Sequence, residues 1–220
     1  MTCERIRCAA VLFDCDGVLV DSDASVARAW TRWADAESLD VERVLAMVHG
    51  RRAEDTVGLL VSEDRREASL QLINRLELED ASTVTPLPGA LSCTEDMAEG
   101  TWAVVTSATR ELAKARLAAV GIDPPVLLTA DDVEHGKPAP EGWLRAAALL
   151  GASISECIVL EDSGAGVTAA HSAGALLAVG VGERGFATDA DLVIRDLRDL
   201  VWVGDGVRLV ATEGPGRSPR

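Results

Sequence analysis

The spacing of hydrophobic residues changes twice along the chain. Residues 9–13 form an uncharged apolar run that predicts a strand buried on both faces, as in the middle of a parallel sheet. Over residues 21–85, apolar residues recur at helical spacing with polar residues between them, which predicts three or four amphipathic helices and no strand. The turn Pro86-Leu87-Pro88-Gly89 then marks a return to short apolar runs.

Repeated alternation of strands and helices follows this turn. Strands are predicted at residues 102–106, 126–128, 158–160 and 176–179, with weaker candidates at 191–194 and 207–210, and helices at 90–99, 110–120, 141–150 and 167–173. Such alternation implies helices on both faces of a parallel sheet, so the predicted fold class is α/β with a doubly wound parallel sheet.

A helical insert that begins directly after a sheet strand predicts a small separate domain. We therefore expect a core domain of residues 1–20 and 86–212 and an inserted small α-helical cap domain of residues 21–85. The tail of residues 213–220 is rich in Gly, Pro and Ser and is predicted to be disordered.

Composition and charge narrow the classes of function. Hydrophobic residues make up 48% and charged residues 26% of the chain, as in soluble globular proteins. The formal net charge of −15 would repel nucleic acid and anionic membrane surfaces, so neither is an expected partner. There is no signal-peptide pattern and no membrane-length apolar run, and the five scattered cysteines fit free buried thiols. We therefore predict a cytoplasmic protein.

Two carboxylates and a glycine end the first predicted strand. Asp14 and Asp16 are two residues apart, so an extended backbone directs both side chains to one side, and Gly17 lets the chain turn away. The pair fits a turn or an ion pair, or else a bound divalent cation, because Mg²⁺ is held by carboxylates together with substrate phosphate. Ligands bind at this end of the strands in open α/β sheets.

Polar residues also follow the second predicted core strand. Thr106, Ser107 and Ala108 offer hydroxyls and backbone N–H groups that could hold an anion, although the same residues are also typical of an ordinary helix N-cap. Further on, Lys137 lies in a proline-rich loop that suits either a charge held in one place or a solvated surface lysine.

The strand at residues 158–160 repeats the opening pattern, since Glu161 and Asp162 follow it directly. If the sheet order brings Asp162 beside Asp14, three or four carboxylates converge and need neutralising charge. A divalent metal and Lys137 would supply it, and a phosphate would complete the balance.

The segment 180–185 fits the dinucleotide-binding pattern GxGxxG, but that motif needs a helix that starts inside it. The following residues lead to another short strand instead, so nucleotide binding is not expected there.

Four motifs in order resemble the haloacid dehalogenase-like (HAD) hydrolase superfamily. They are Asp14-Cys15-Asp16-Gly17 as the opening DxDG, Thr106-Ser107 after the second strand, the GKP lysine Lys137, and Glu161-Asp162-Ser163. The match extends over about residues 9–195. It implies a Rossmann-like HAD core, and the position of the helical insert resembles the cap of the β-phosphoglucomutase-like branch. Within that branch the sequence resembles bacterial sugar-phosphate phosphatases.

The resemblance implies a role for each motif. Asp14 would be the nucleophile and Asp16 the general acid and base, and Mg²⁺ would be held by Asp14, the backbone carbonyl of Asp16, and Asp162 with Glu161 nearby. The remaining phosphate oxygens would be held by residues of two motifs, Thr106, Ser107, Ala108 and Lys137. In the cap, the candidates that face the substrate are His49, Arg51, Arg52 and Asp55, which could equally form the solvated polar end of a helix.

The protein is predicted to be a Mg²⁺-dependent phosphatase that hydrolyses a small phosphorylated sugar or polyol through an aspartyl phosphate. Its expected partner is a phosphorylated metabolite, and its expected oligomeric state is a monomer. The alternative is a β-phosphoglucomutase-type isomerase. Mutases of this branch carry a histidine in the first cap helix, and the corresponding residue here is Val26. An inactive phospho-ligand sensor would be expected to have lost a motif carboxylate or the lysine, and all are present.

Overall fold

A six-stranded parallel sheet forms the centre of the molecule. The computed structural model describes the backbone of residues 2–211 and the side chains of residues 5–209, so the predicted disordered tail lies outside the described residues. The strand order is β6-β5-β2-β7-β8-β9, and every pairing is parallel. The strands are β2 (Ala10–Phe13), β5 (Trp102–Val105), β6 (Leu127–Leu128), β7 (Cys157–Glu161), β8 (Leu177–Val181) and β9 (Leu192–Ile194).

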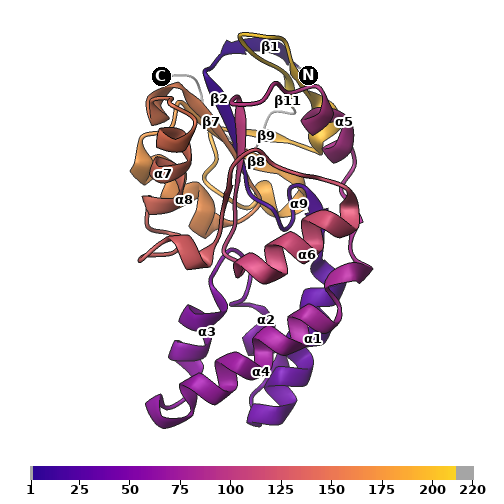
Figure 1. The fold of residues 1–220 in the computed structure, drawn as a ribbon, viewed down its shortest axis with the longest axis vertical. Helices are drawn as coiled ribbons and strands as arrows, with labels where there is room; N and C mark the ends of the chain where they lie inside the picture. The colour runs from indigo at the N-terminus through magenta and orange to yellow at the C-terminus, as the bar shows by residue number, and fades with distance from the viewer. Residues whose placement is uncertain (1, 212–220) are drawn as a thin grey trace.

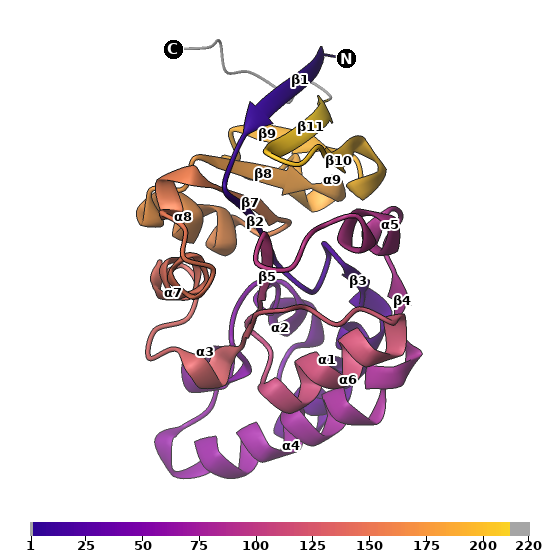
Figure 2. The ribbon, with the colours of Figure 1, turned by 45° about the horizontal axis from the view of Figure 1, so that its top comes forward.

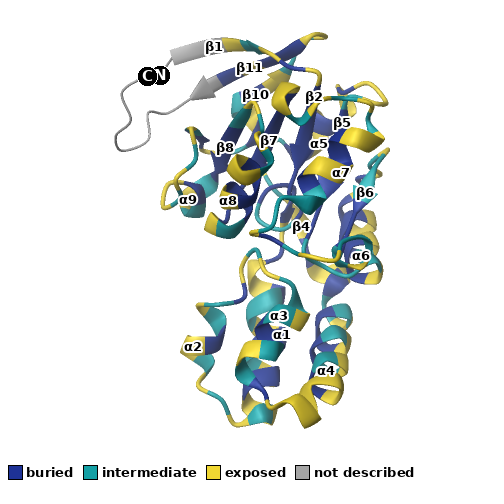
Figure 3. Ribbon diagram, turned by 90° about the vertical axis from the view of Figure 1, so that its left-hand side faces the viewer, coloured by how far each residue is buried: buried dark blue, intermediate teal, exposed yellow. Residues whose placement is uncertain are grey.

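Helices cover both faces of this sheet, and alternate residues of β2 show how. Val11 and Phe13 pack on the side of α5 (Ala90–Glu95) and α6 (Arg110–Val120). Ala10 and Leu12 pack on the side of α7 (Glu141–Leu149) and α8 (Gly164–Ala173). Figure 1 shows these two helical layers on opposite sides of the strands, and Figure 3 shows the strands as the most buried part of the chain. The predicted doubly wound α/β fold is confirmed.

A small antiparallel sheet extends the fold and was not predicted as a whole. It pairs β1 (Thr2–Arg7) with β11 (Gly206–Ala211) and β11 with β10 (Leu200–Trp202). Only the β11 strand was predicted, as a weak candidate. The sequence of β1, TCERIR, has no continuous apolar run and becomes a strand by pairing with residues about 200 positions away.

The residues between β2 and β5 include a group of helices with their own hydrophobic cluster, which we call the helical region (residues 21–85). It comprises α1 (Asp23–Glu37), α2 (Val41–Leu45), α3 (Ala53–Leu60), α4 (Arg66–Glu79) and the short 3₁₀ turns η1 (Glu63–Arg65) and η2 (Ala81–Thr83). Two linkers lead into and out of this region and pair with each other as β3 (Val20–Asp21) and β4 (Thr85–Pro86). The predicted helical insertion is confirmed, whereas its behaviour as a separate cap domain stays a prediction.

Trp30 and Trp33 belong to the cluster inside the helical region. Their ring centroids lie 5.1 Å apart in an edge-to-face arrangement, and the indole N–H of Trp33 donates to the Ser69 carbonyl at 3.1 Å. The pair therefore packs the helices together, as aromatic pairs commonly do.

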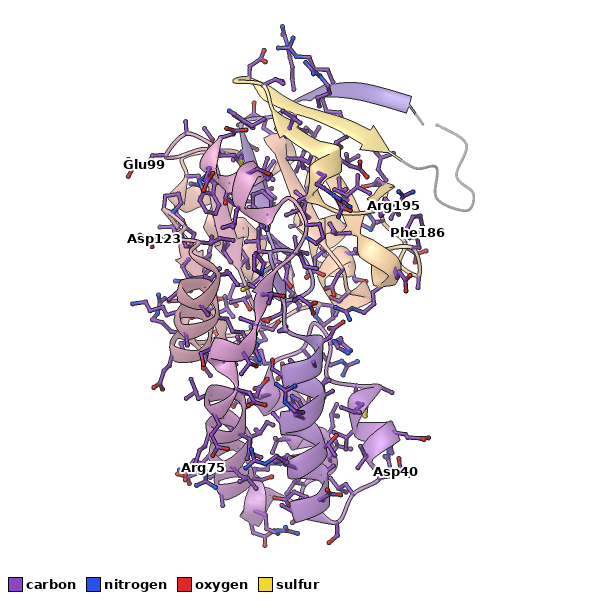
Figure 4. The ribbon with its side chains drawn as sticks, turned by 90° about the vertical axis from the view of Figure 1, so that its right-hand side faces the viewer. Asp40, Arg75, Glu99, Asp123, Phe186 and Arg195 are labelled. Atoms are coloured by element: carbon purple, nitrogen blue, oxygen red, sulfur yellow. The ribbon has the colours of Figure 1, made fainter. Side chains whose placement is uncertain are left out.

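Charged side chains point outward from both parts of the molecule. Figure 4 shows this for Asp40 and Arg75 on the helical region and for Glu99 and Asp123 beside the sheet. Within residues 2–211, no helix combines the length and the apolar character needed to cross a membrane.

Candidate active site

The carboxyl ends of three adjacent strands bring the predicted motifs together. Asp14 follows β2, Thr106 follows β5, and Asp162 follows β7, and β2 lies between the other two in the sheet. The parallel pairing continues into the site, since the Asp14 N–H donates to the Leu160 carbonyl at 2.9 Å. The convergence predicted from the sequence is therefore observed, at the edge of the sheet where α/β proteins bind ligands.

Lys137 is a buried cation at the centre of this edge. Its Nζ donates to Asp14 Oδ1 at 2.5 Å, to Glu161 Oε1 at 2.6 Å and to the Val105 carbonyl at 3.2 Å. Nζ also lies 4.6 Å from the ring centroid of Trp143. Burial alone would lower the lysine pKa, but the two carboxylates raise it above its usual value. Lys137 is thus a fixed positive charge and not a solvated surface lysine.

Three buried carboxylates, from Asp14, Glu161 and Asp162, form an acidic cluster. One oxygen of each lies within 4.8 Å of the others. Burial, with repulsion from the neighbouring acids, raises the pKa of Asp14 well above its usual range despite Lys137. Burial and the Glu161 charge raise the pKa of Asp162 to about 7. Such a cluster of oxygen ligands carries excess negative charge, and this donor set fits a divalent cation such as Mg²⁺.

The three carboxylates differ in how many oxygens are already engaged. Glu161 accepts from Lys137 through Oε1, and from the N–H and hydroxyl of Ser163 through Oε2 at 2.7 and 2.9 Å. Asp14 and Asp162 each use one oxygen in the hydrogen bonds of the described residues, Oδ1 and Oδ2 respectively. Asp14 and Asp162 therefore keep an oxygen for a ligand, while Glu161 anchors the surrounding groups.

Two glycines allow the acids to approach the backbone. Gly17 has φ +83°, and a Cβ there would lie 2.6 Å from Cγ of Asp162. A Cβ on Gly166 would lie 2.6 Å from Cγ of Glu161. Both separations are far below van der Waals contact, so these positions are restricted to glycine by close packing as well as, for Gly17, by conformation.

The Thr106-Ser107-Ala108 segment forms a loop ahead of α6. The N-cap of α6 is Thr109, so the alternative in which Thr106 or Ser107 caps the helix is wrong. Thr106 is buried and its hydroxyl accepts from the Ala108 N–H at 3.1 Å. The Ser107 hydroxyl donates to the Gly50 carbonyl at 3.0 Å and so joins this loop to the helical region.

Of the predicted cap residues, His49, Arg51 and Arg52 lie on the segment between α2 and α3, whereas Asp55 lies within α3 and outside the cavity wall to which the other three belong. His49, Arg51 and Arg52 line a cavity of about 210 Å³ whose wall also includes Asp14, Asp16, Thr106, Ser107 and Ala108. Arg52 is held by Asp55, with Nε–Oδ2 at 2.9 Å, and donates to the Glu134 carbonyl at 3.1 Å. Arg51 is exposed and forms no ion pair with the described residues. Loss of hydration and the nearby Arg184 charge lower the pKa of His49.

Two arginines of the site were not anticipated from the sequence. Arg116 on α6 donates from Nη1 to Asp16 Oδ1 at 3.0 Å and from Nη2 to Glu77 Oε1 at 3.3 Å. Arg184 donates from Nε to Asp162 Oδ2 at 2.7 Å and from Nη1 to both oxygens of Asp23 at 2.8 and 2.7 Å. Both residues connect a candidate site carboxylate to the helical region.

Arg184 lies in the segment that fits GxGxxG. The expectation that no helix starts inside this segment is wrong, because the one-turn helix α9 (Gly182–Gly185) begins there. The signal that could have revealed Arg184 is its position, three residues beyond the carboxyl end of β8, on the same edge of the sheet as Asp162.

Known proteins resemble this chain in sequence and in fold. A family model described as haloacid dehalogenase-like hydrolase matches residues 8–174. Hexitol phosphatase A of Escherichia coli is 36% identical over 203 residues, which cover 89% of this chain and 94% of that protein. Beta-phosphoglucomutase of Bacillus subtilis is 29% identical over 214 residues, covering 87% and 91%. The crystal structure of a hydrolase from Pseudomonas syringae aligns with a TM-score of 0.78 at 26% identity, covering 86% of this chain and 94% of that one.

Proposed function

Since the chain belongs to the haloacid dehalogenase-like hydrolase family and is a phosphoric monoester hydrolase of that family, we propose that it removes phosphate from a small phosphorylated sugar or polyol through an aspartyl phosphate. The resemblance drawn from the four motifs is confirmed by the family match. The observation that carries the proposal is the arrangement around Asp14, whose Oδ1 is fixed by Lys137 while the residue lines the cavity.

In the proposed reaction Asp14 attacks the phosphorus in line through its second oxygen, Oδ2. The bond from phosphorus to the leaving oxygen breaks, and Asp16 gives that oxygen its proton. Asp16 then takes a proton from a water molecule, which attacks the phosphorus of the aspartyl phosphate. The bond between phosphorus and Asp14 Oδ2 breaks, which frees the Asp14 carboxylate and inorganic phosphate. Asp14 and Asp16 return to their starting states, so protons and charge balance over the cycle.

The other predicted residues hold the phosphoryl oxygens and the metal. Lys137, the Thr106 and Ser107 hydroxyls and the Ala108 N–H would bind phosphate oxygens. The Ser107 hydroxyl and the Ala108 N–H would exchange their present hydrogen bonds, to the Gly50 carbonyl and the Thr106 hydroxyl, for the phosphate. Mg²⁺ would be held by Asp14, the Asp16 carbonyl and Asp162, with Glu161 orienting the cluster, and when bound it neutralises charge on the transferring group. The raised pKa values of Asp14 and Asp162 support a cation at this place.

The helical region is proposed to act as a cap that excludes water and selects the substrate. His49, Arg51 and Arg52 are its proposed substrate-facing residues. Polar Asn74 and Glu77 line the cavity beside apolar Trp30 and Leu70, a mixture that suits a carbon chain carrying hydroxyl groups. A hexitol phosphate is therefore the first substrate to test, in keeping with the name of the relative in Escherichia coli. That the protein works as a cytoplasmic monomer stays a prediction.

A β-phosphoglucomutase-type isomerase is the second candidate, because one relative has that name. The residue that would need to transfer a proton, by the family pattern, is here Val26, and Val26 lines the cavity. An apolar side chain at that position favours hydrolysis. Incubation with β-glucose 1-phosphate separates the candidates, since a mutase yields glucose 6-phosphate and a phosphatase yields free phosphate.

The test is a phosphate-release assay with a panel of sorbitol 6-phosphate, mannitol 1-phosphate, glycerol 1-phosphate, 2-deoxyglucose 6-phosphate and p-nitrophenyl phosphate. We expect Mg²⁺-dependent release from at least one sugar or polyol phosphate, abolished by EDTA. Asp14→Asn should remove turnover, whereas the same substitution at the exposed Asp123 should leave it unchanged. Near-normal turnover by a folded Asp14→Asn protein would contradict the mechanism.

A further inference from the structure

Arg116 joins two acidic residues that come from different parts of the fold. It lies on α6, beside the sheet, and only 2% of its surface is exposed. Asp16 belongs to the loop after β2, and Glu77 belongs to α4 of the helical region, where 8% of its surface is exposed. Figure 2 shows α6 lying along the helical region, in agreement with the contacts between α6 and α4.

The guanidinium divides its hydrogen bonds between these two acids. Nη1 donates to Asp16 Oδ1 at 3.0 Å and Nη2 donates to Glu77 Oε1 at 3.3 Å. Nε of Arg116 is the one buried side-chain nitrogen or oxygen among the described residues that lacks a hydrogen-bond partner. Asp16 therefore receives a single N–H from this arginine, although an arginine fork can hold both oxygens of a carboxylate.

We propose that Arg116 is a positioning residue that holds Asp16 by Oδ1 and so presents Oδ2 to the leaving oxygen, with Glu77 keeping the guanidinium in this single-contact orientation. The proposal rests on the proposed function, in which Asp16 transfers the proton. Arg116 touches neither of the bonds that form or break, and it acts through the orientation of Asp16.

Through Glu77, the hydrogen bond from Arg116 to Asp16 depends on the position of the helical region. If Glu77 were absent, both Nη1 and Nη2 would be available to Asp16, and a two-point contact would occupy the oxygen needed for proton transfer. With Glu77 in place, the Nη2 donor is already used. Packing of α4 against α6 therefore sets how Asp16 is held, which links the proton-transfer group to the contact between the helical region and α6.

The test compares substrates that differ in their need for a general acid. p-Nitrophenolate leaves without protonation, whereas the alkoxide of a sugar or polyol needs a proton. Arg116→Lys keeps the charge but loses the two-armed geometry. In single-turnover experiments it should slow release of the leaving group about 10-fold or more for the best sugar or polyol phosphate of the panel, part of the roughly 10²- to 10⁴-fold that general acid–base catalysis contributes. With p-nitrophenyl phosphate, the rate of p-nitrophenolate release should stay within about 3-fold of wild type, whereas hydrolysis of the aspartyl phosphate, in which Asp16 acts as base, should slow for both substrates.

Glu77→Gln provides a second, nearly isosteric variant that carries the test if Arg116→Lys does not fold. It should also slow leaving-group release selectively for the sugar or polyol phosphate. Arg75→Lys, on the exposed face of α4 and without an ion pair to the described residues, is the matched control and should behave as wild type. In the double variant with Asp16→Asn, Arg116→Lys should cause no further loss on the sugar or polyol phosphate.

Three results would overturn the inference. Equal losses in the rate of leaving-group release from both substrates would show a structural role only, a raised KM with unchanged kcat would show substrate binding, and additive losses in the double variant would show that Arg116 acts independently of Asp16. Failure of the proposed function itself looks different, because the wild-type protein would then release no phosphate from any panel member with Mg²⁺.

Discussion

Gly166→Ala is predicted to damage the site through one added methyl group. Gly166 lies in the first turn of α8, and its Cβ would lie 2.6 Å from Cγ of Glu161 and closer still to Oε1. Glu161 has no exposed surface and is held by Lys137 and Ser163, so its side chain cannot move without breaking hydrogen bonds. The methyl group therefore displaces the carboxylate that anchors Lys137.

The magnitude follows from opposing contributions. Alanine in a helix is more favourable than glycine by up to about 1 kcal/mol. Each hydrogen bond to the Glu161 carboxylate that is lost costs about 1.5–3 kcal/mol. Loss of one or two of these bonds gives a net decrease of about 0.5–5 kcal/mol in the free energy of unfolding. Because Lys137 also fixes Asp14, we expect kcat to fall by about 10-fold or more, since small displacements of reacting groups have large effects.

Urea unfolding and thermal melting measure the first effect, with Tm lowered by about 2–4 °C per kcal/mol for a protein of this size. Phosphate release measures the second. Gly164→Ala is the matched control, because it lies in the same helical turn and a Cβ there would meet no atom within 4 Å. A Gly166→Ala protein within about 0.5 kcal/mol of wild type, the ordinary scatter of harmless substitutions, and with full activity would refute the reasoning.

Three further predictions concern stability and thiol reactivity. Thr109→Ala removes the N-cap that accepts from the Leu112 N–H, so urea unfolding should show a loss of about 0.5–2 kcal/mol. Hydrogen bonds from Thr129 and Arg110 outweigh partial burial and hold the pKa of Asp132 below its usual range. The Asp132 carboxylate should therefore contribute its full stabilisation above the unfolded pKa near 3.8 and lose it as the pH falls through the lower folded pKa. In a plot of the urea unfolding midpoint against pH, Asp132→Asn should make the decrease at acidic pH less steep. Burial raises the pKa of every described thiol, so an aromatic disulfide reagent at pH 8 should modify them only after unfolding. Peptide mass spectrometry separates these four thiols from Cys3, and rapid modification of any of the four in the native protein would contradict their burial. These thiols are Cys8, Cys15, Cys93 and Cys157.

The sequence alone determined the sheet and the carboxyl-end motifs. A central parallel strand is buried on both faces, so its sequence is an uncharged apolar run. The polar residues that follow the run mark the carboxyl-end edge of the sheet, where ligands bind. Asp14, Thr106 and Asp162 could be placed at one edge for this reason, and the structure brings them together. The helical insertion was equally visible, because the hydrophobic spacing changes after the first strand.

Partners that lie far apart in the sequence are brought together by the packing of the folded chain and could not be predicted. The strand β1 has no apolar run of its own and is defined by pairing with β11. Arg116 and Glu77 look in the sequence like ordinary charged positions of amphipathic helices, and only the packing of α6 against α4 buries them together with Asp16. An ion pair has no local pattern, because its energy depends on the distance and the burial that folding creates.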